Sequence, residues 1–387
     1  MIKIENPADC CGCTACANIC HHAAIAMMPD SLGFLYPQID VSKCIDCGLC
    51  NQVCQFNETY DHTLNFAVPR AYAARHKDID EIMKSRSGAV FVAISDYILN
   101  QGGIVYGAGY KDHFRVVHKR ATTKEERDEF RGSKYVQSEL TDTFVQVKKD
   151  LKEGRLVLFT GTPCQTSGLS AFVGRKNREN LILADLVCHG VPSPYIWRDY
   201  VRYLEKKEGD VIVKVDFRNK EKFGWHSHKE LYSFSKGKEK VCSSYTYLFY
   251  KHIMFRRSCS KCHFTNLMRP SDITLADFWG WEEKVPLLNE DDKGVSLVLI
   301  NTEVGYALWM SVQDEVISFP IEIKDCMQPN LYIPSKEHPS RMDFENLYTS
   351  KGLKAVMNCY GDTGWKYKKR EHMKRVKSII KKVLNRK

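Results

Sequence analysis

The sequence lacks the segments by which secreted and membrane-spanning proteins are recognised. Its first residues, Met1–Glu5, lead into no apolar stretch of the kind found in a signal peptide. No apolar run approaches the roughly 20 residues that a membrane-spanning helix needs. Sixteen cysteines without a secretory signal favour a reducing compartment and metal binding over disulfides. We therefore expect a cytoplasmic protein whose cysteines bind metal.

The common phosphate-binding motifs are absent as well, and most of the chain has no excess of charge. Gly102, Gly103, Gly107 and Gly109 do not fit G-x-G-x-x-G, and no Walker loop occurs. Residues 366–387 hold eleven Lys and Arg against one Glu, which leaves 46 basic and 46 acidic side chains in the rest of the chain. Because this body is balanced, it has no electrostatic reason to bind nucleic acid, and we expect no nucleic-acid partner.

Cysteine is what the sequence has in abundance, and eight cysteines form two runs of identical C-x2-C-x2-C-x3-C spacing. This pattern binds cubane 4Fe-4S clusters, and the fourth cysteine of each run binds the cluster of the other run. Zinc sites favour C-x2-C pairs across longer loops instead. The proline that often follows each run is replaced by His21 and Gln55. Cys11 does not fit the spacing, and we expect it to be a packed thiol or one that lies next to the cluster ligands. We assign one 4Fe-4S cluster to Cys10, Cys13, Cys16 and Cys54, and a second to Cys44, Cys47, Cys50 and Cys20.

Two further cysteines lie at the ends of predicted strands. Residues 156–160 and 181–187 are short apolar runs separated by a helical pattern, which predicts two buried parallel strands joined by a crossover helix. Cys164 and Cys188 follow these strands. The carboxyl ends of parallel strands meet at one edge of a sheet, so we expect the two thiols to be neighbours there.

The pair Cys259-x2-Cys262 completes a set of four thiols in the body of the chain. Four converging thiolates suit a third 4Fe-4S cluster or a tetrahedral zinc ion, and the plainest alternative is two core thiols beside a pair that binds nothing. Zinc carries no electrons, so the two clusters already predicted favour a third cluster. The remaining cysteines are expected to pack as small hydrophobic residues: Cys242, Cys326 and Cys359.

Several stretches of the body form a recognisable set: GSKYVQS at 132–138, GTPCQ at 161–165, VCHGVPS at 187–193, CSKC at 259–262 and SDITLADFWG at 271–280. In this order they resemble the beta subunit of coenzyme F420-reducing hydrogenase and its relatives, which include formate dehydrogenase beta subunits and a chlorophyll reductase of plants. The resemblance covers about residues 1 to 335. It implies a flavoprotein with FAD beside an iron–sulfur cluster, a substrate pocket over the flavin, and Cys164, Cys188, Cys259 and Cys262 as the cluster ligands.

FAD is inferred from this resemblance alone, and with it a set of candidate contacts. Lys134 and Arg131 are candidates to neutralise flavin phosphates or the reduced ring, and the backbone of the Thr160–Pro163 turn is a candidate cradle. The family's Ser-Gly-Gly is here Ser87-Gly88-Ala89, which departs at the third position. For each candidate the alternative is an ordinary solvated or capping residue. The predicted cofactor-binding residues are Ser87, Gly88, Arg131, Ser133, Lys134, Tyr135, Gln137, Thr160, Gly161, Thr162 and Pro163.

Two residues are predicted to have catalytic roles. His189, beside Cys188, is a candidate proton donor or partner of the cluster ligand, and a structural hydrogen bond is the alternative. Lys134 is the second candidate. His226 and His228 are weaker candidates.

The fold class predicted is a multidomain α+β and α/β protein, in which a ferredoxin-like module with two 4Fe-4S clusters precedes an α/β domain with a mixed, partly parallel sheet. We expect the ferredoxin-like domain at 1–60, a flavin-associated α/β domain at 70–185 and a cluster- and substrate-associated domain at 186–335. A C-terminal extension at 336–387 would end in a basic amphipathic helix at 366–387.

This organisation predicts an oxidoreductase that passes electrons between ferredoxin-type clusters and an FAD, which reduces or oxidises a small organic substrate. A redox protein or a reduced coenzyme would be the other partner. One alternative is an electron-transfer adapter in a larger redox complex, with no substrate of its own. Another is a cluster-bearing structural or regulatory protein without flavin.

The basic tail carries a narrow apolar stripe at helical spacing, with Lys and Arg opposite. Such a helix suits an anionic membrane surface, which would place the protein at the inner face of the membrane. The alternatives are a helix docked on the protein's own body, a frayed tail, or nucleic-acid binding. The stripe consists of Met373, Val376, Ile379, Ile380, Val383 and Leu384.

Overall fold

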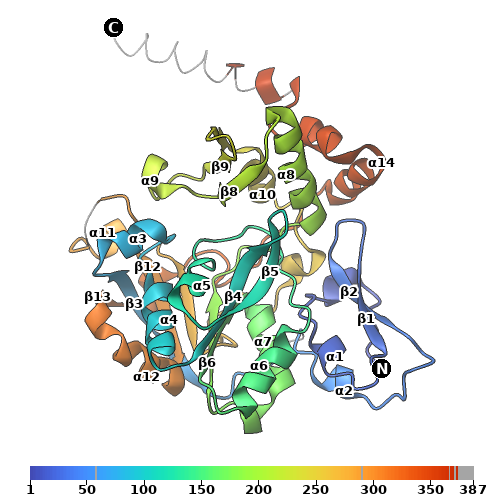
Figure 1. The fold of residues 1–387 in the computed structure, drawn as a ribbon. Coiled ribbons are helices and arrows are strands. Elements are labelled where there is room, and N and C mark those ends of the chain that lie inside the picture. Colours follow the sequence, from blue (N-terminus) through green and yellow to red (C-terminus); the bar gives the residue numbers. More distant parts are fainter. Residues whose placement is uncertain (57–58, 289–290, 366, 370–371, 374–387) are drawn as a thin grey trace.

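The computed structural model describes residues 1–56, 59–288, 291–365, 367–369 and 372–373 of the 387-residue chain (Figure 1). Its N-terminal module is small and is built around the two cysteine runs. A 3-10 turn η1 (Pro7–Asp9) and the short helices α1 (Ala15–Asn18) and α2 (Leu49–Gln52) flank an antiparallel hairpin of β1 (Ile25–Pro29) and β2 (Leu35–Ile39). None of the helices in the described part of the chain combines the length and apolar content needed to span a bilayer.

An eight-stranded mixed sheet forms the centre of the body, in the order β13-β3-β12-β11-β7-β6-β4-β5. The four strands β4, β6, β7 and β11 pair in parallel, while β12, β3, β13 and β5 extend the two sides by antiparallel pairing. The strands are β3 (Asn65–His76), β4 (Ile104–Lys111), β5 (Arg115–Ala121), β6 (Val157–Gly161), β7 (Leu181–Leu186), β11 (Ile273–Asp277), β12 (Ser296–Thr302) and β13 (Val316–Ile321).

Helices cover both faces of this sheet because its central strands are apolar on both sides. Val105, Leu158 and Ile182 pack on one face with the side chains of α4 and α12, whereas Val157 and Phe159 pack on the other with those of α6 and α7. Figure 1 shows the N-terminal module beside α6 and α7. The helices of this region are α3 (Ile79–Lys84), α4 (Val90–Asn100), α5 (Lys124–Asp128), α6 (Thr143–Lys152), α7 (Pro163–Val173), α11 (Trp281–Lys284), α12 (Glu303–Ser311) and α13 (Ile323–Cys326), with 3-10 turns η2 (Arg175–Asn177), η3 (Arg257–Lys261) and η4 (Gln313–Glu315).

A smaller antiparallel sheet, β10-β9-β8, lies at the other end of the body with helices around it (Figure 1). The small sheet and the helices around it share a core cluster of buried side chains that contains Trp197, Tyr200, Tyr232 and Tyr245. The strands are β8 (Ile212–Asp216), β9 (Glu230–Phe234) and β10 (Glu239–Cys242), and the helices are α8 (Pro194–Glu208), α9 (Lys220–Phe223), α10 (Ser244–Tyr250) and α14 (Arg341–Cys359).

The predicted fold class is confirmed: a dicluster region precedes an α/β body with a mixed, partly parallel sheet. The domain boundaries stay a prediction. Strands β3 to β7 of the eight-stranded sheet lie at residues 65–186, and strands β11 to β13 lie at residues 273–321. The sheet therefore crosses the boundary proposed between the segments 70–185 and 186–335. The prediction of a basic helix at 366–387 falls almost wholly outside the described residues.

Candidate metal centres

The first cavity of interest is the inner ferredoxin site, lined by Cys10, Cys13, Cys16 and Cys54. Its loop places Cys10 after η1 and turns through Thr14 (φ 64°) into α1, which carries Cys16. Cys54 arrives from the second run, just after α2. The structure thus brings together the four cysteines that spacing assigns to one cluster.

The second cavity is the outer ferredoxin site, lined by Cys20, Cys44, Cys47 and Cys50. Here Gly48 (φ 76°) takes the left-handed place that Thr14 has in the first run, and α2 carries Cys50. Cys20 arrives from the first run, so the exchange of fourth cysteines is present in the geometry of both sites.

The third cavity is the body site, lined by Cys164, Cys188, Cys259 and Cys262. Cys164 lies in the first turn of α7, directly after β6, and Cys188 follows β7, which pairs with β6 in parallel. The pair Cys259 and Cys262 comes from η3 and the residue after it. The parallel pairing explains why the two strand ends meet, as the sequence pattern predicts.

These cavities suit clusters better than single ions. In the described part of the chain, no three His, Cys, Asp or Glu side chains are grouped so as to hold one metal ion. A tetrahedral zinc site needs its thiolates about 2.3 Å from one point. In a cubane each thiolate binds a different iron, so the four sulfurs stand farther apart around a larger space. Ligation of iron by these twelve cysteines stays a prediction.

The thiols of the body site differ in how readily they lose a proton. A hydrogen bond with Cys11 and a second with the Thr162 hydroxyl, whose Oγ1 lies 3.2 Å from Sγ, lower the pKa of Cys164 to about 7. Burial raises the pKa of Cys262 to about 11 and that of Cys259 to about 12. Binding iron would remove this burial penalty because the metal replaces the proton on sulfur.

The inner ferredoxin site and the body site share a wall. Cys11 and Phe56 line both cavities. The apolar cluster to which they belong also contains Tyr60 and Phe264 and packs against Cys13 and Cys54 on one side and Cys164 and Cys262 on the other. The inner and outer sites are likewise joined, because Cys16 and Cys50 pack in one cluster with Ile2. The three sites therefore form a row with the inner site in the middle.

Gly168 makes the close approach of module and body possible. A Cβ at this position of α7 would lie 2.8 Å from Sγ of Cys13. No side chain larger than hydrogen fits there without moving the cysteine loop. Because Cys164 lies one turn earlier on the same helix, the helix connects the inner site to the body site.

Ser87 and Gly88, two of the predicted cofactor contacts, lie in the loop before α4. The Ser87 hydroxyl donates to Asp277 at the end of β11 and accepts from Nε1 of Trp225 at 3.1 Å. A Cβ on Gly88 would lie 2.3 Å from the carbonyl oxygen of Ala74, so only glycine fits. Ala89, which departs from the family's pattern, has φ 63°, a conformation that glycine adopts more readily than alanine.

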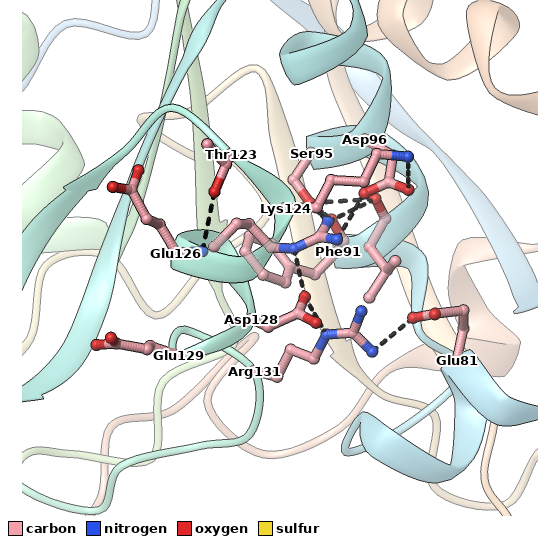
Figure 2. Close-up of polar contacts among 12 residues, drawn as sticks. Glu81, Phe91, Ser95, Asp96, Thr123, Lys124, Glu126, Asp128, Glu129 and Arg131 are labelled. Carbon is pink, nitrogen blue, oxygen red and sulfur yellow. Dashed lines mark hydrogen bonds and ion pairs between the residues drawn. The ribbon is translucent and has the colours of Figure 1, made fainter.

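Arg131, Ser133, Lys134 and Tyr135 lie in the segment after α5. Figure 2 shows the Arg131 guanidinium between Glu81 and Asp128, 2.5 Å and 2.7 Å from their oxygens. The charge of Arg131 is thus balanced by two acids, and the contacts give it the role of tying α5 to α3.

Lys134 donates from Nζ to the carbonyl oxygens of Glu129 at 2.6 Å and Arg131 at 3.0 Å, and burial lowers its pKa to about 7. The amino group of Lys134 therefore stabilises the loop in which Lys134 itself lies. Tyr135 accepts a hydrogen bond at its carbonyl from Tyr245 and packs edge-on to Phe249. Ser133 is half-buried in the same loop.

The remaining predicted cofactor contacts lie by the cysteine sites instead. Gln137 donates from Nε2 to the carbonyl oxygen of Cys11 at 2.9 Å. Thr162 and Gln165 form a capping box at the start of α7, with Pro163 in its first turn, and Thr160 donates to the carbonyl oxygen of Tyr106 at 2.9 Å. Thr160, Gly161, Thr162 and Pro163 thus position Cys164, a role that their sequence motif did not reveal.

His118 stabilises this turn and was missed by the sequence analysis. It is buried, stacks on Phe159, and its Nε2 lies 3.0 Å from the carbonyl oxygen of Thr160. Its Nδ1 lies 2.9 Å from the hydroxyl of Ser138, which accepts from Gln165. Burial lowers the pKa of His118 to about 4. A neutral His118 therefore stabilises the loop that carries Cys164.

His189 lines the body site, as its position beside Cys188 suggests. Its Nε2 lies 2.7 Å from Nε2 of His252, and burial lowers its pKa to about 4. At neutral pH one ring donates to the other, so a proton is held between them. His228 receives a 2.5 Å contact from the Tyr250 hydroxyl, and His226 pairs with Asp292 and Glu282 on a more exposed surface.

Arg256 was also missed, and it contacts both the inner site and the body site. Its Nε donates to the carbonyl oxygen of Cys10 at 2.7 Å, and its Nη2 lies 3.6 Å from Sγ of Cys10. Its backbone is held in the body site, where the amide of Cys259 donates to its carbonyl at 3.0 Å. No spacing rule points to it, because Cys10 lies 246 residues away. Among the cysteines outside the sites, Cys326 is buried, Cys242 half-buried and Cys359 exposed.

Two family models match separate parts of this chain. Residues 154–322 match the family model for the C-terminal part of the beta subunit in coenzyme F420 hydrogenase/dehydrogenase. Residues 9–57 match the model described as "4Fe-4S dicluster domain". No curated protein matches. A solved structure of the F420-reducing nickel–iron hydrogenase complex from Methanosarcina barkeri, derivatised with xenon, contains a chain that is 18% identical, with a TM-score of 0.46 and alignment over 76% of this chain and 91% of that one.

Proposed function

We propose that this chain, which matches a 4Fe-4S dicluster domain over residues 9–57 and the C-terminal part of the coenzyme F420 hydrogenase/dehydrogenase beta subunit over residues 154–322, is a flavin-dependent iron–sulfur oxidoreductase. Electrons move between a redox partner and an FAD through three 4Fe-4S clusters. The outer ferredoxin site meets the partner, the inner site relays, and the body site exchanges electrons with the FAD. A small organic molecule is the final donor or acceptor.

The observation that carries this proposal is the grouping of twelve cysteines around three adjacent cavities. Each cavity is lined by four of them, and neighbouring sites share an apolar wall. The outer site is the natural entry, because Cys47 and Ile45 beside it are exposed.

The loop at 85–88 and Arg218, which follows β8, have unpaired donor atoms that suit the anionic and hydrogen-bonding parts of FAD. The hydroxyl of Ser85 and the Nε atoms of Arg86 and Arg218 are buried and have no partner among the described residues. Arg86 pairs with Asp216, and Arg218 pairs with Asp277, which also holds Ser87. These residues would hold the cofactor, and Arg131, whose charge two acids already balance, would not contact it.

FAD, when bound, supplies exchange of a hydride with organic molecules and of single electrons with clusters. Near the body site, two histidine side chains of this chain would hold a proton. His189 and His252 share a proton between their Nε2 atoms. Since burial holds the pKa of His189 at about 4, the pair stays uncharged near neutral pH and holds its proton beside the cluster without adding positive charge.

The test is the flavin content of anaerobically purified protein and its reoxidation by candidate organic acceptors. One FAD per chain, lost in Arg218→Gln but kept in the exposed control Arg198→Gln, is the expected result. Protein that binds no flavin after reconstitution would contradict the proposal.

A second candidate is an electron-transfer adapter within a larger redox complex, which the exposed surface beside the outer site favours. Val41 and Ile45 are 72% and 64% exposed there. If the protein binds FAD but is reoxidised only when a partner protein is present, the adapter function replaces the enzyme.

A further inference from the structure

Arg256 differs from every other deeply buried arginine in the described part of the chain. Six arginine residues are 5% exposed or less, and Arg256 is 1% exposed. The other five each have a carboxylate partner: Arg75 with Asp291, Arg127 with Asp96, Arg218 with Asp277, Arg269 with Asp185 and Arg341 with Glu345. Arg256 forms no ion pair with a described Asp or Glu.

The neighbours of the Arg256 guanidinium are neutral groups and cysteines. It donates to the carbonyl oxygens of Cys10 and Leu35, at 2.7 Å and 2.9 Å, and to Oε1 of Gln137 at 3.1 Å. The ring of Tyr36 lies 4.2 Å from its Cζ. Each nitrogen of the guanidinium thus has an acceptor, but none of these contacts balances its charge.

An unbalanced buried charge is costly, so a compensating negative charge is expected nearby. The cysteine sites offer one source. Arg256 touches Cys10 of the inner ferredoxin site and lines the body site with Cys259 and Cys262. Four thiolates around each cluster carry net negative charge, which grows when the cluster takes up an electron.

We propose that Arg256 is the shared counter-ion of the inner cluster and the body cluster, and that its charge makes both easier to reduce than the outer cluster. This inference rests on the three-cluster arrangement of the proposed function. A fixed positive charge stabilises the reduced, more negative state of any cluster close to it. Among the described residues, no arginine or lysine lines the outer site, and the α-ammonium group of Met1, which also lines it, is paired with the carboxylate of Asp46. Electrons that arrive at the outer site are therefore drawn inward.

The test compares three full-length variants by redox titration followed with EPR. Arg256→Gln removes the charge, and Arg256→Lys keeps it. Arg257→Gln is the matched control, because it removes an equal charge one residue away, from an arginine that pairs with Glu345. A Cys47→Ala variant identifies the signal of the outer cluster by its loss.

In Arg256→Gln we expect the equilibrium constant for reduction to fall about tenfold or more for two clusters, which is about 59 mV for a one-electron couple. The outer cluster keeps its potential. Arg256→Lys and Arg257→Gln keep all three potentials near those of the unmodified protein. If Arg256→Gln fails to load the inner cluster, loading of Arg256→Lys supports the counter-ion role.

Unchanged potentials in Arg256→Gln, or equal shifts in Arg256→Gln and Arg257→Gln, would overturn the inference. Failure of Arg256→Lys to load iron would also overturn it, because the residue would then act through its geometry. The iron content of the unmodified protein separates this outcome from a failure of the proposed function. About eight irons per chain would remove the three-cluster premise itself, whereas about twelve with unshifted potentials would remove the inference alone.

Discussion

The inner and outer ferredoxin sites are built from cysteine runs of identical spacing, and they differ in what surrounds them. The inner site lies against α7, shares a wall with the body site and has Arg256 beside it. The outer site has an exposed cysteine, Cys47, and exposed apolar neighbours. The same cysteine spacing therefore forms one site against the body and one site at the surface. The difference comes from residues outside the cysteine pattern.

The surroundings also decide how much of the molecule depends on each site. Ala15 and Val53 of the module belong to the core cluster formed by α6, α7 and the sheet. The outer site packs mainly within the module, through Ile2 and Cys50. Damage at the inner site should therefore spread to the body, while damage at the outer site should stay local.

The largest expected effect is the loss of a cluster, and it should separate the two sites. Cys13→Ala and Cys47→Ala should each lose about four irons per chain. Only Cys13→Ala should also lower the melting temperature of the body, because Cys13 packs against α7. Iron analysis and calorimetry under anaerobic conditions measure both. Equal melting temperatures in the two variants would show that the module does not support the body.

Gly168→Ala tests the same contact without removing a ligand. The new methyl group would lie 2.8 Å from Sγ of Cys13, so the cysteine loop must move. Overpacking of this kind costs about 1–3 kcal/mol, against a gain of up to about 1 kcal/mol in helix propensity. We expect a net loss of stability in denaturant titrations and an altered EPR signal of the inner cluster alone. Ser170→Ala on the same helix is the control. An unchanged inner signal would argue against close packing here.

The body site should weaken in acid, because the loop that carries Cys164 needs a neutral His118. The pKa of His118 is lowered to about 4 in the folded protein, from 6.5 when unfolded. Its contribution to stability is therefore full above about pH 6.5 and is lost as pH falls toward 4. Between about pH 7 and pH 5.5 we expect a loss of about 1 kcal/mol from this residue. His118→Gln should remove this loss of stability between pH 7 and pH 5.5; an unchanged pH dependence would mean that the pKa of His118 is the same in the folded and the unfolded protein.

The smallest effect concerns the left-handed residue before each short helix. Gly48 has φ 76° and open space around its Cβ position, so Gly48→Ala should cost about 1 kcal/mol through backbone strain alone. Thr14 already has φ 64° at the matching place, where it is buried. In Thr14→Gly, the stability gained by relieving backbone strain should be smaller than the stability lost with the packing of the Thr14 side chain. Denaturant titration of both variants measures the difference, and a neutral Gly48→Ala would contradict the strain argument.

Much of the arrangement could be predicted from the sequence, because it depends on local spacing or on parallel strands. The C-x2-C-x2-C-x3-C runs predicted which cysteines meet at the two ferredoxin sites. Two apolar strands joined by a helix predicted that Cys164 and Cys188 meet at a sheet edge. In each case a short-range pattern leaves little choice of geometry.

The rest depends on contacts between distant segments, which no local pattern encodes. Arg256 reaches Cys10 only because η3 packs against η1. The pairing of Arg131 with Glu81 likewise joins two segments that are far apart in the sequence, and no local pattern encodes it.

The central claim is that three clusters lie in a row with the inner ferredoxin cluster in the middle. The most direct measurement is the iron and sulfide content of anaerobically purified protein, of Cys259→Ala, and of Cys326→Ala, whose cysteine is buried outside all three sites. The account predicts about twelve irons per chain in the unmodified protein and in Cys326→Ala, and about eight in Cys259→Ala. About eight irons in the unmodified protein, unchanged in Cys259→Ala, would contradict it.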